Sequence, residues 1–263
     1  MKLAVHGATG RMGRAIVRLA REAHGFDIVG AIAGTDAVDL GRDIGELAGL
    51  GPIGVVVTAD VGSGILGADV IIDFSAASAV KGIAKAAERA KIPLVSGTTG
   101  LDDDAKRALD AASKSIPVLW AANMSLGIEV LSRLVRQAIA QLGPGFDVEI
   151  VETHHRAKVD SPSGTAHRLV EAAKESRSEL RARYGREGLV GARPDDEIGV
   201  LAVRGGDVIG DHSVHLLGPG ERIELTHRAT NRDLFAHGAL RAARWIVGKA
   251  PGSYAIRDLV DSR

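Results

Sequence analysis

The chain contains no cysteine among its 263 residues. This absence excludes disulfide bonds, thiolate catalysis and metal sites with cysteine ligands, and it fits the reducing conditions of a cytosol. An excess of charge is also missing, because 33 lysine and arginine residues balance 33 aspartate and glutamate residues. No net field therefore attracts nucleic acid or an anionic membrane, and any attraction for acidic ligands must be local.

Long apolar stretches are missing as well. No run of residues reaches the roughly 20 apolar positions that a membrane-spanning helix needs. Met1 and Lys2 lead directly into a strand-like stretch, without the pattern of a signal peptide. We therefore predict a cytoplasmic protein that does not interact with membranes. The length suffices for a substantial core and for two unequal domains.

A strand followed by closely spaced glycines opens the sequence. Residues 3–13 read LAVHGATGRMG, with glycine at positions 7, 10 and 13, and apolar residues at helical spacing follow from Ile16 to Ala20. A strand, a glycine-rich turn and the N-terminus of a helix together form a cradle for pyrophosphate. The spacing is GxxGxxG rather than GxGxxG, so an ordinary turn that binds nothing is the alternative.

Patterns typical of strands and helices alternate up to about residue 125. This alternation predicts a doubly wound, Rossmann-like parallel sheet. Ligands of such sheets collect at the carboxyl ends of the strands, where the loops 96–100 and 121–124 fall. Turn chemistry alone would explain either loop. Together with the glycine-rich turn, however, three loops would lie along one edge, which favours contact with a cofactor. After the first strand, the predicted strands are residues 26–32, 54–57, 69–74, 92–95 and 116–120.

The pattern changes after a long predicted helix at residues 131–142. A strand at 147–152, a helix at 166–175 and three strand candidates with short turns predict a second, α+β domain with an antiparallel or mixed sheet. Such an open sheet can also serve as a subunit interface. The charged segment 176–197 is expected to be a solvated loop or a short helix. The three strand candidates are residues 199–204, 208–216 and 222–229.

These patterns divide the chain into three segments. We predict a dinucleotide-binding domain at residues 1–125 and a domain for substrate binding and oligomerisation at residues 126–232. A last helix, within residues 231–249, is expected to pack back on the first domain as part of a C-terminal segment, residues 233–263.

The densest group of reactive side chains lies between Glu152 and Ala166. This run, ETHHRAKVDSPSGTA, holds two imidazoles and the ammonium of Lys158 directly after a strand-like stretch. In its Pro-Ser-Gly-Thr turn the glycine permits a tight bend, and the hydroxyls can cap the helix that follows. The free amides at that helix start would point at an anion. The run therefore predicts a site for a small acidic molecule.

A metal site in this run is a weaker alternative. Adjacent histidines on an extended chain point to opposite sides, so His154 and His155 are poor joint ligands for one ion. Zinc bound by Glu152, His154 and Asp160 is disfavoured by the missing cysteine and the loose spacing, and we predict no metal.

The other histidines carry less information. A single histidine is more often a hydrogen-bonded core or surface residue than a catalyst, and only the cluster with Lys158 favours a functional site. His227 and Arg228, at the end of a predicted strand, could approach a substrate. No role is predicted for His167, His212, His215 and His237.

Motifs along nearly the whole chain resemble the 4-hydroxy-tetrahydrodipicolinate reductase (dihydrodipicolinate reductase) family. The block E-x-HH-x-x-K-x-D-x-PSGTA at 152–166 is highly specific. The other motifs are GATGRMG at 7–13, GELAG at 45–49, DF at 73–74, SGTTG at 96–100, AANMSLG at 121–127 and the closing Gly252-x-Tyr254. The resemblance implies reduction of 4-hydroxy-tetrahydrodipicolinate to tetrahydrodipicolinate with NADH or NADPH, in the diaminopimelate route to lysine. It also implies a homotetramer built through the sheet of the second domain.

The resemblance implies roles for individual residues. His154 would handle a proton, Lys158 would donate a proton or bind a substrate carboxylate, and His155 would contact the substrate. Chemically, hydride addition to a conjugated imine leaves electron density on nitrogen, which must be protonated. The expected substrate-binding residues are His155, Ser163, Gly164 and Thr165. The expected cofactor-binding residues are Gly7, Ala8, Thr9, Gly10, Arg11, Met12, Gly13, Ala33, Gly97, Thr98, Thr99, Ala121, Ala122, Asn123 and Met124.

The chain departs from the family where the adenosine ribose is read. An acidic residue after the second strand takes the ribose hydroxyls in dinucleotide-binding folds, whereas a nearby arginine favours the 2′-phosphate. Here Ala33 and Gly34 occupy the positions of the acidic residue and of the basic residue that follows it in relatives, so the cofactor preference of the family cannot be carried over. Arg11 could reach the ribose or its phosphate, and Asp36 could replace the missing acid. We predict that NADH and NADPH both serve.

Two other functions fit parts of the pattern. One is a different two-domain NAD(P)-dependent dehydrogenase that acts on a small hydroxy acid, sugar or amino acid. The other is a non-enzymatic dinucleotide sensor. The turn beside HHxxK argues against the first, and Lys158 would have no purpose in the second. Fold alone cannot decide among these functions.

Overall fold

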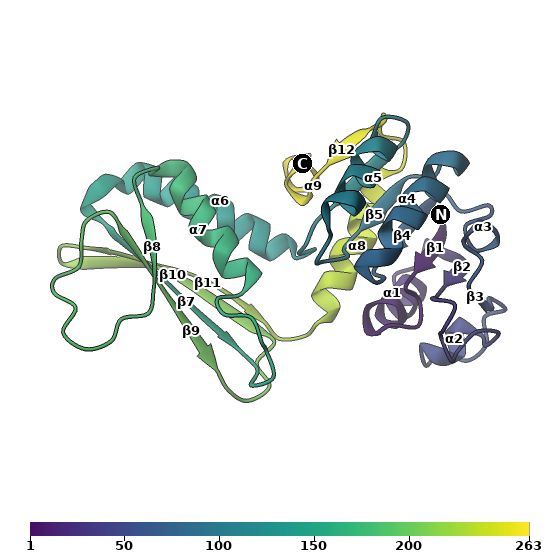
Figure 1. Ribbon diagram of the computed structural model, residues 1–263, viewed down its shortest axis with the longest axis horizontal. Helices are drawn as coiled ribbons and strands as arrows, with labels where there is room; N and C mark the ends of the chain where they lie inside the picture. Colours follow the sequence, from purple (N-terminus) through teal and green to yellow (C-terminus); the bar gives the residue numbers. More distant parts are fainter. Residues whose placement is uncertain (263) are drawn as a thin grey trace. The chain divides into compact units, whose positions relative to one another are not determined.

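The computed structural model describes residues 1–262, which form two compact units (Figure 1). The first unit comprises Met1–Met124 and the segment from Asp233 onward, and the second comprises Ser125–Arg232. The second unit is therefore inserted into the first along the chain. Among the described residues, no helix combines the length and the apolar character that crossing a bilayer would require.

A parallel sheet forms the centre of the first unit. Its strands are β1 (Lys2–His6), β2 (Asp27–Ile32), β3 (Val57–Thr58), β4 (Val70–Asp73), β5 (Leu94–Ser96), β6 (Pro117–Trp120) and β12 (Gly252–Tyr254). The seven strands lie in the order β12-β6-β5-β4-β1-β2-β3, and all neighbouring pairs are parallel. The predicted doubly wound sheet is confirmed. The short strand β12 was not predicted.

Helices cover both faces of this sheet because its strands are apolar on both sides. The helices are α1 (Arg11–Glu22), α2 (Ile44–Leu47), α3 (Val61–Gly64), α4 (Ala77–Ala90), α5 (Asp103–Ser113), α8 (Asp233–Ile246) and α9 (Ile256–Asp261). Ala4 and Ile71 pack in one cluster with Val80 and Ile83 of α4, while their strand neighbour Leu3 is fully buried on the alternate side. α4 packs against α5, and α8 packs against α1 and against β4, β5 and β6.

The second unit contains a mixed sheet. Its elements are α6 (Leu126–Leu142), the 3₁₀ turn η1 (Gly143–Gly145), β7 (Asp147–His154), α7 (Gly164–Ser176), β8 (Arg181–Tyr184), β9 (Glu197–Arg204), β10 (Gly210–Gly218) and β11 (Glu221–Ala229). The strand order is β11-β10-β7-β9-β8. β10 runs antiparallel to β7 and β11, whereas β9 runs parallel to β7 and β8. The expectation of an antiparallel or mixed sheet is confirmed in its mixed form.

One face of this sheet is covered by helices and the other is open. β7 alternates buried and half-buried residues, and Val148 and Ile150 pack in one cluster with Leu131 of α6 and Leu169 of α7. Figure 1 shows both helices on the same side of the sheet. Leu201 and Val203 of β9, one and three residues after the core residue Val200, are exposed. This open face therefore carries apolar side chains without a cover from its own chain.

The expectation for the charged segment 176–197 was partly wrong. Arg181–Tyr184 forms β8 at the edge of the sheet, parallel to β9, instead of a loop or helix. The nearby charges are paired, since Arg186 and Arg193 both contact Glu149 on β7. Pairing lets these long side chains lie along the sheet, which a count of charged residues does not predict.

Candidate active site

Two close backbone approaches shape the glycine-rich turn of the first unit. Gly7 has a φ of +77°, and a Cβ atom added there would lie 2.3 Å from the carbonyl oxygen of Phe74. A Cβ atom added at Gly13 would lie 2.3 Å from the carbonyl oxygen of Gly7. The N–H groups of Gly7 and Ala8 both donate to the carbonyl oxygen of Ile32 at 2.9 Å. The turn therefore lies so close to its neighbours that only glycine fits at positions 7 and 13.

Helix α1 begins directly after this turn. Gly10 is its N-cap residue and makes no side-chain cap, and the first turn contains no acidic residue. The first N–H groups of a helix find no partner within the helix and carry positive partial charge. Arg11 is exposed at the same end. This helix start suits a phosphate group of a dinucleotide.

A buried carboxylate joins the loops that follow neighbouring strands. Asp73, at the end of β4, accepts hydrogen bonds from Ser96 Oγ (2.7 Å), Thr98 Oγ1 (2.9 Å) and the N–H of Ser75 (3.2 Å). Nδ1 of His6, the last residue of β1, lies 2.7 Å from its Oδ1. Burial opposes ionisation of Asp73, but hydrogen bonds from His6, Ser75 and Ser96 outweigh it and lower its pKa below the usual value. This network was not predicted from the sequence.

The other expected cofactor residues lie at the same edge of the sheet. Gly97 to Thr99 follow β5, and Ala121 to Met124 follow the neighbouring strand β6. Thr98 uses its hydroxyl for Asp73, and the side chain of Met124 is buried. A contact of these two residues with a cofactor would therefore involve their backbone atoms.

A carboxylate lies at the position where an acidic residue was expected to bind the adenosine ribose. Ala33 is buried directly after β2, and Gly34 is exposed beside it. Asp36 Oδ1 lies 2.7 Å from the place that a Cβ atom of residue 34 would take. The carboxylate of Asp36 thus folds back over Gly34, into the space of the missing side chain.

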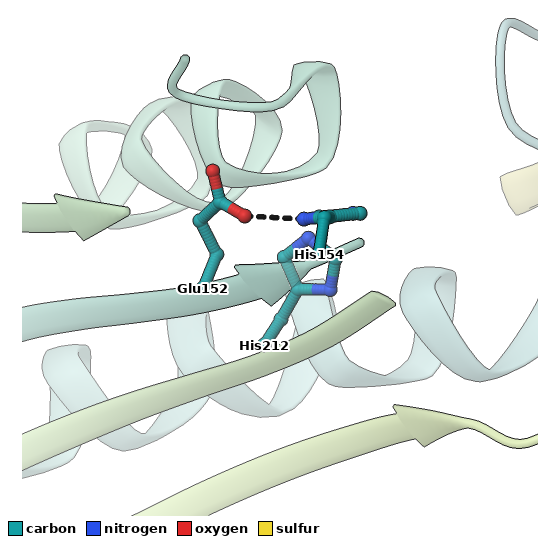
Figure 2. A group of neighbouring side chains, drawn as sticks. All are labelled: Glu152, His154 and His212. Carbon is teal, nitrogen blue, oxygen red and sulfur yellow. Dashed lines mark hydrogen bonds and ion pairs between the residues drawn. The ribbon is translucent and has the colours of Figure 1, made fainter. Parts of the chain in front are cut away.

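In the second unit, β7 carries Glu152 and His154 on its core-facing side. Both follow Val148 and Ile150 in the alternation of the strand; Glu152 is fully buried and His154 is 8% exposed. Their side chains are hydrogen-bonded through His154 Nδ1 and Glu152 Oε2, as Figure 2 shows. An anionic carboxylate at this point favours the imidazole tautomer with its proton on Nδ1.

Glu152 has further partners on both oxygens. Arg204, on β9, donates two hydrogen bonds to it, at 2.7 Å to Oε1 and 2.9 Å to Oε2. The N–H of Ser163 donates to Oε1 at 3.1 Å. Burial alone would raise the pKa of Glu152, but the hydrogen bonds from Arg204 and His154 prevail and lower it. Glu152 is therefore a buried anion with a full set of donors.

A third buried side chain, His212, joins this group from β10. Its ring lies edge-on to that of His154 with centroids 5.1 Å apart, and its Nε2 is 3.1 Å from Ser163 Oγ. Figure 2 shows His212 on the strand next to β7. Burial is the main reason that the pKa of His212 falls to about 4, and burial also lowers the pKa of His154. Both imidazoles are therefore neutral at pH 7.

The sequence predicted no role for His212, and the structure places it, buried, beside His154 and Ser163. Its signal was present in the alternation of β10, which places His212 on the buried side with Val214 and Leu216. The partner residue Glu152 could not be read from the sequence, because only the register of β10 on β7 sets the two opposite each other.

The loop after β7 holds Lys158. Its Nζ donates to Asp160 Oδ1 at 2.7 Å, and its side chain is about one-fifth exposed. Arg204 donates to the carbonyl oxygen of Asp160 at 2.8 Å. His155 points away from His154, and its Nε2 is 3.2 Å from a guanidinium nitrogen of Arg232. The opposite directions of the two adjacent histidines agree with extended backbone geometry.

The turn after this loop starts α7. Ser163 is the N-cap residue, and its Oγ accepts a hydrogen bond from the N–H of Ala166 at 3.2 Å. The helix begins at Gly164, two residues before the predicted start, because the cap residue precedes the apolar pattern. Gly164 is exposed and Thr165 is half-buried at this end. The predicted capping by a hydroxyl of the turn is confirmed.

The alternative zinc site is not formed as the sequence suggested. Within residues 1–262, the potential ligand atoms that lie within 4.8 Å of one another belong to Glu152, His154 and His212. Asp160 is not in this group, and its carboxylate binds Lys158. Arg204 and an amide already occupy the oxygens of Glu152. A guanidinium at hydrogen-bonding distance repels a second cation, so this group suits a proton better than a metal ion.

A doubly wound parallel sheet with a glycine-rich turn after its first strand, joined to a mixed-sheet unit, defines a two-domain protein of the Rossmann-like, dinucleotide-binding class. The N-terminal model of dihydrodipicolinate reductase matches residues 1–124, and the C-terminal model of the same enzyme matches residues 127–260. The chain therefore belongs to the dihydrodipicolinate reductase family.

Individual relatives agree with this membership. The chain is 47% identical to a 4-hydroxy-tetrahydrodipicolinate reductase of Anaeromyxobacter dehalogenans strain 2CP-1, over 100% of this chain and 98% of that protein. It is 49% identical to the enzyme of that name from Methanopyrus kandleri, over 97% and 95% of the two chains. Its fold matches a dipicolinate-bound dihydrodipicolinate reductase from Paenisporosarcina sp. TG-14 with a TM-score of 0.76, at 23% identity and with 97% of each chain covered.

Proposed function

We propose that the protein reduces 4-hydroxy-tetrahydrodipicolinate to tetrahydrodipicolinate with NADH or NADPH, as a step of the diaminopimelate route to lysine. The observation that carries this proposal is the capped turn at Ser163, which places the N-terminal end of helix α7 in the same short segment as His154 and Lys158. A dicarboxylate requires such local positive groups in a chain whose total charge is zero. Reductases of that name share 41% to 49% of their residues with this chain.

The first unit would hold the dinucleotide. The crowded turn at Gly7 and Gly13 brings backbone close to a pyrophosphate, and the start of α1 offers its amides. Arg11 adds a positive charge at the same end, and the loops after β5 and β6 complete the edge. When bound, the nicotinamide supplies the hydride for the reduction.

The second unit would hold the substrate. One carboxylate would bind at the start of α7, through the amides of Gly164 and Thr165 and the side chain of Thr165. Lys158 and His155 would provide countercharge and hydrogen bonds for the other carboxylate. Ser163 contributes through its capping hydroxyl, which fixes the backbone of the turn.

Proton transfer would involve Lys158 and His154. The substrate nitrogen gains electron density as hydride arrives at the ring and must then be protonated. An ammonium group carries protons that it can give. The pKa of His154 lies below its usual value because of burial, so its neutral imidazole is an acceptor at pH 7 rather than a ready donor. We therefore assign the donated proton to Lys158. The net conversion also releases the 4-hydroxyl group as water, and His154 would accept the ring proton that leaves with it.

We further propose a homotetramer and a cytoplasmic location. The open face of the second sheet, with exposed Leu201 and Val203, supports an interface through this sheet. A biosynthetic reductase needs a supply of reduced nicotinamide, which the cytoplasm provides. Size-exclusion chromatography with light scattering tests the assembly, and Leu201→Lys with Val203→Lys should reduce the measured mass.

A coupled assay tests the proposed function. Pyruvate and aspartate semialdehyde are supplied with the upstream synthase, and oxidation of NADH or NADPH is followed by the loss of nicotinamide absorbance. We expect oxidation that depends on all components and is absent without the synthase. Failure of the purified, folded protein to oxidise either cofactor would overturn the proposal. A panel of hydroxy acids, sugars and amino acids in the reverse direction tests the alternative dehydrogenase.

A further inference from the structure

One guanidinium group connects both residues that we propose to handle protons. Arg204 binds the two oxygens of Glu152 at 2.7 and 2.9 Å, and Glu152 in turn binds Nδ1 of His154. The same group donates to the carbonyl oxygen of Asp160 at 2.8 Å, and the carboxylate of Asp160 binds Lys158. Arg204 thus contacts the supports of His154 and Lys158 at once.

The arrangement is built by the sheet. Parallel pairing of β7 with β9 sets His154 opposite Arg204, and alternation places the side chains of Glu152 and Arg204 on the same face. Glu152 is fully buried, so its charge is held by partners rather than by water. A buried carboxylate with two hydrogen bonds from one guanidinium group has little freedom to move. The imidazole of His154, which is hydrogen-bonded to it, is therefore fixed in direction.

We propose that Arg204 and Glu152 are positioning residues of the reductase, which set the tautomer and direction of His154 and the place of the loop that carries Lys158. The inference rests on the proposed function for its catalytic meaning. Glu152 accepts a hydrogen bond from the protonated Nδ1 of His154. The free lone pair of this imidazole therefore lies on Nε2. The ring of His154 also packs edge-on against His212, with centroids 5.1 Å apart. Neither Glu152 nor Arg204 needs to touch the substrate for this role.

The charged and titratable groups around His154 predict the direction of a pH effect. Burial lowers the pKa of His154, Glu152 raises it, and Lys158 and Arg204 lower it further, while His212 lies beside it as a neutral ring. Glu152→Gln removes the group that raises the pKa and leaves Arg204 without its counterion. The pKa of His154 should therefore fall further in this variant.

Kinetics of matched variants test the inference. Glu152→Gln should lower kcat by at least about tenfold, since a misoriented catalytic imidazole costs far more than this in hydrolases, while KM changes little. The acidic limb of its pH profile should move to lower pH. Arg204→Lys keeps the positive charge but loses the forked geometry of the guanidinium group. We therefore expect kcat to fall, while the acidic limb of the pH profile stays at nearly the same pH. Arg181→Gln, which changes an exposed arginine on β8, should match the wild type.

Folding is controlled separately. Arg204→Gln strands a buried carboxylate and can unfold the protein, so the double variant Glu152→Gln with Arg204→Gln supplies a neutral pair at the same place. We expect this variant to fold by circular dichroism and to keep the loss of kcat. Wild-type kcat in the folded double variant, or Glu152→Gln with kcat within twofold of wild type and an unmoved acidic limb, would overturn the inference.

A measurement without substrate separates this inference from the proposed function. Protein labelled with carbon-13 at histidine Cε1 reports each imidazole by NMR, and His154→Gln assigns the signal. In the wild type the His154 signal should titrate below the ordinary histidine pKa, and in Glu152→Gln it should titrate lower still. An unchanged titration would refute the positioning role even if the coupled assay failed. An inactive wild type with the expected titration would refute only the reductase function.

Discussion

Asp73→Asn tests what stabilises the cofactor edge, that is, the loops at the carboxyl ends of the strands of the first sheet. Asp73 is fully buried at the end of β4, and its two oxygens serve His6, Ser75, Ser96 and Thr98. Asparagine keeps the shape but replaces one acceptor oxygen by a donor group. The hydroxyls of Ser96 and Thr98 both donate to Oδ2, so an amide nitrogen at that place leaves two hydroxyl hydrogens without their acceptor.

The expected cost follows from these bonds. A hydrogen bond to a charged group contributes about 1.5 to 3 kcal/mol, and rotation of one hydroxyl can recover part of the loss. We therefore expect the free energy of unfolding to fall by about 3 kcal/mol, measured by urea denaturation at pH 7. Because the same bonds join three loops of the cofactor edge, the Kd for NADPH should rise at least about tenfold, or 1.4 kcal/mol.

The pH dependence of this effect has a definite sign. The pKa of Asp73 is lowered in the folded protein, so its stabilisation is present above the unfolded value of about 3.9 and is lost as the pH falls through the folded value. The stability difference between wild type and Asp73→Asn should therefore shrink in acid.

Asp69→Asn is the matched control for Asp73→Asn. Asp69 is exposed just before the same strand and accepts one bond from the N–H of Lys2, so this variant should cost under about 1 kcal/mol. Equal effects of the two variants, or an Asp73→Asn protein with wild-type stability and cofactor affinity, would refute the reasoning.

Three further predictions concern the proposed reaction. Lys158→Ala and His154→Ala should each fold normally and lose at least about 2 to 3 kcal/mol of transition-state stabilisation, measured as kcat/KM. A kcat/KM within a few-fold of wild type would refute the assignment of proton transfer to that residue. Pyridine-2,6-dicarboxylate, a planar mimic of the substrate, should inhibit competitively and raise Tm, and no thermal shift at millimolar levels would count against a dicarboxylate site. NADH and NADPH should give kcat/KM values within about tenfold of each other, and Ala33→Glu should shift the ratio toward NADH. A preference beyond roughly a hundredfold would show that another residue reads the 2′ position.

Local sequence signals predicted the parts of the site that are local in the chain. The glycine-rich turn, the capped start of α7 and the opposite directions of His154 and His155 each follow from residues within a few positions of one another. Repeated strand and helix patterns likewise predicted both sheets. Such features depend on backbone geometry and periodicity, which a short stretch of sequence already contains.

The contacts that support the site depend on register and could not be predicted. Arg204 meets Glu152 only because β9 pairs with β7 in one particular alignment, and His212 meets it because β10 pairs on the other side. A shift of one residue in either strand would turn these side chains to the open face. His6 and Asp73 also meet through strand pairing, since β1 and β4 are neighbours in space and far apart in the chain.

The insertion of the second unit into the first has a consequence for biosynthesis. Residues 125–232 leave the ribosome before α8 and β12, which pack on β4, β5 and β6 and extend the edge of the first sheet. The inserted unit contains all strands of its own sheet, so it can complete its core while the first unit still lacks a covering helix. During that interval the nascent first sheet exposes apolar surface and a free strand edge at β6, the features that chaperones bind and that promote aggregation.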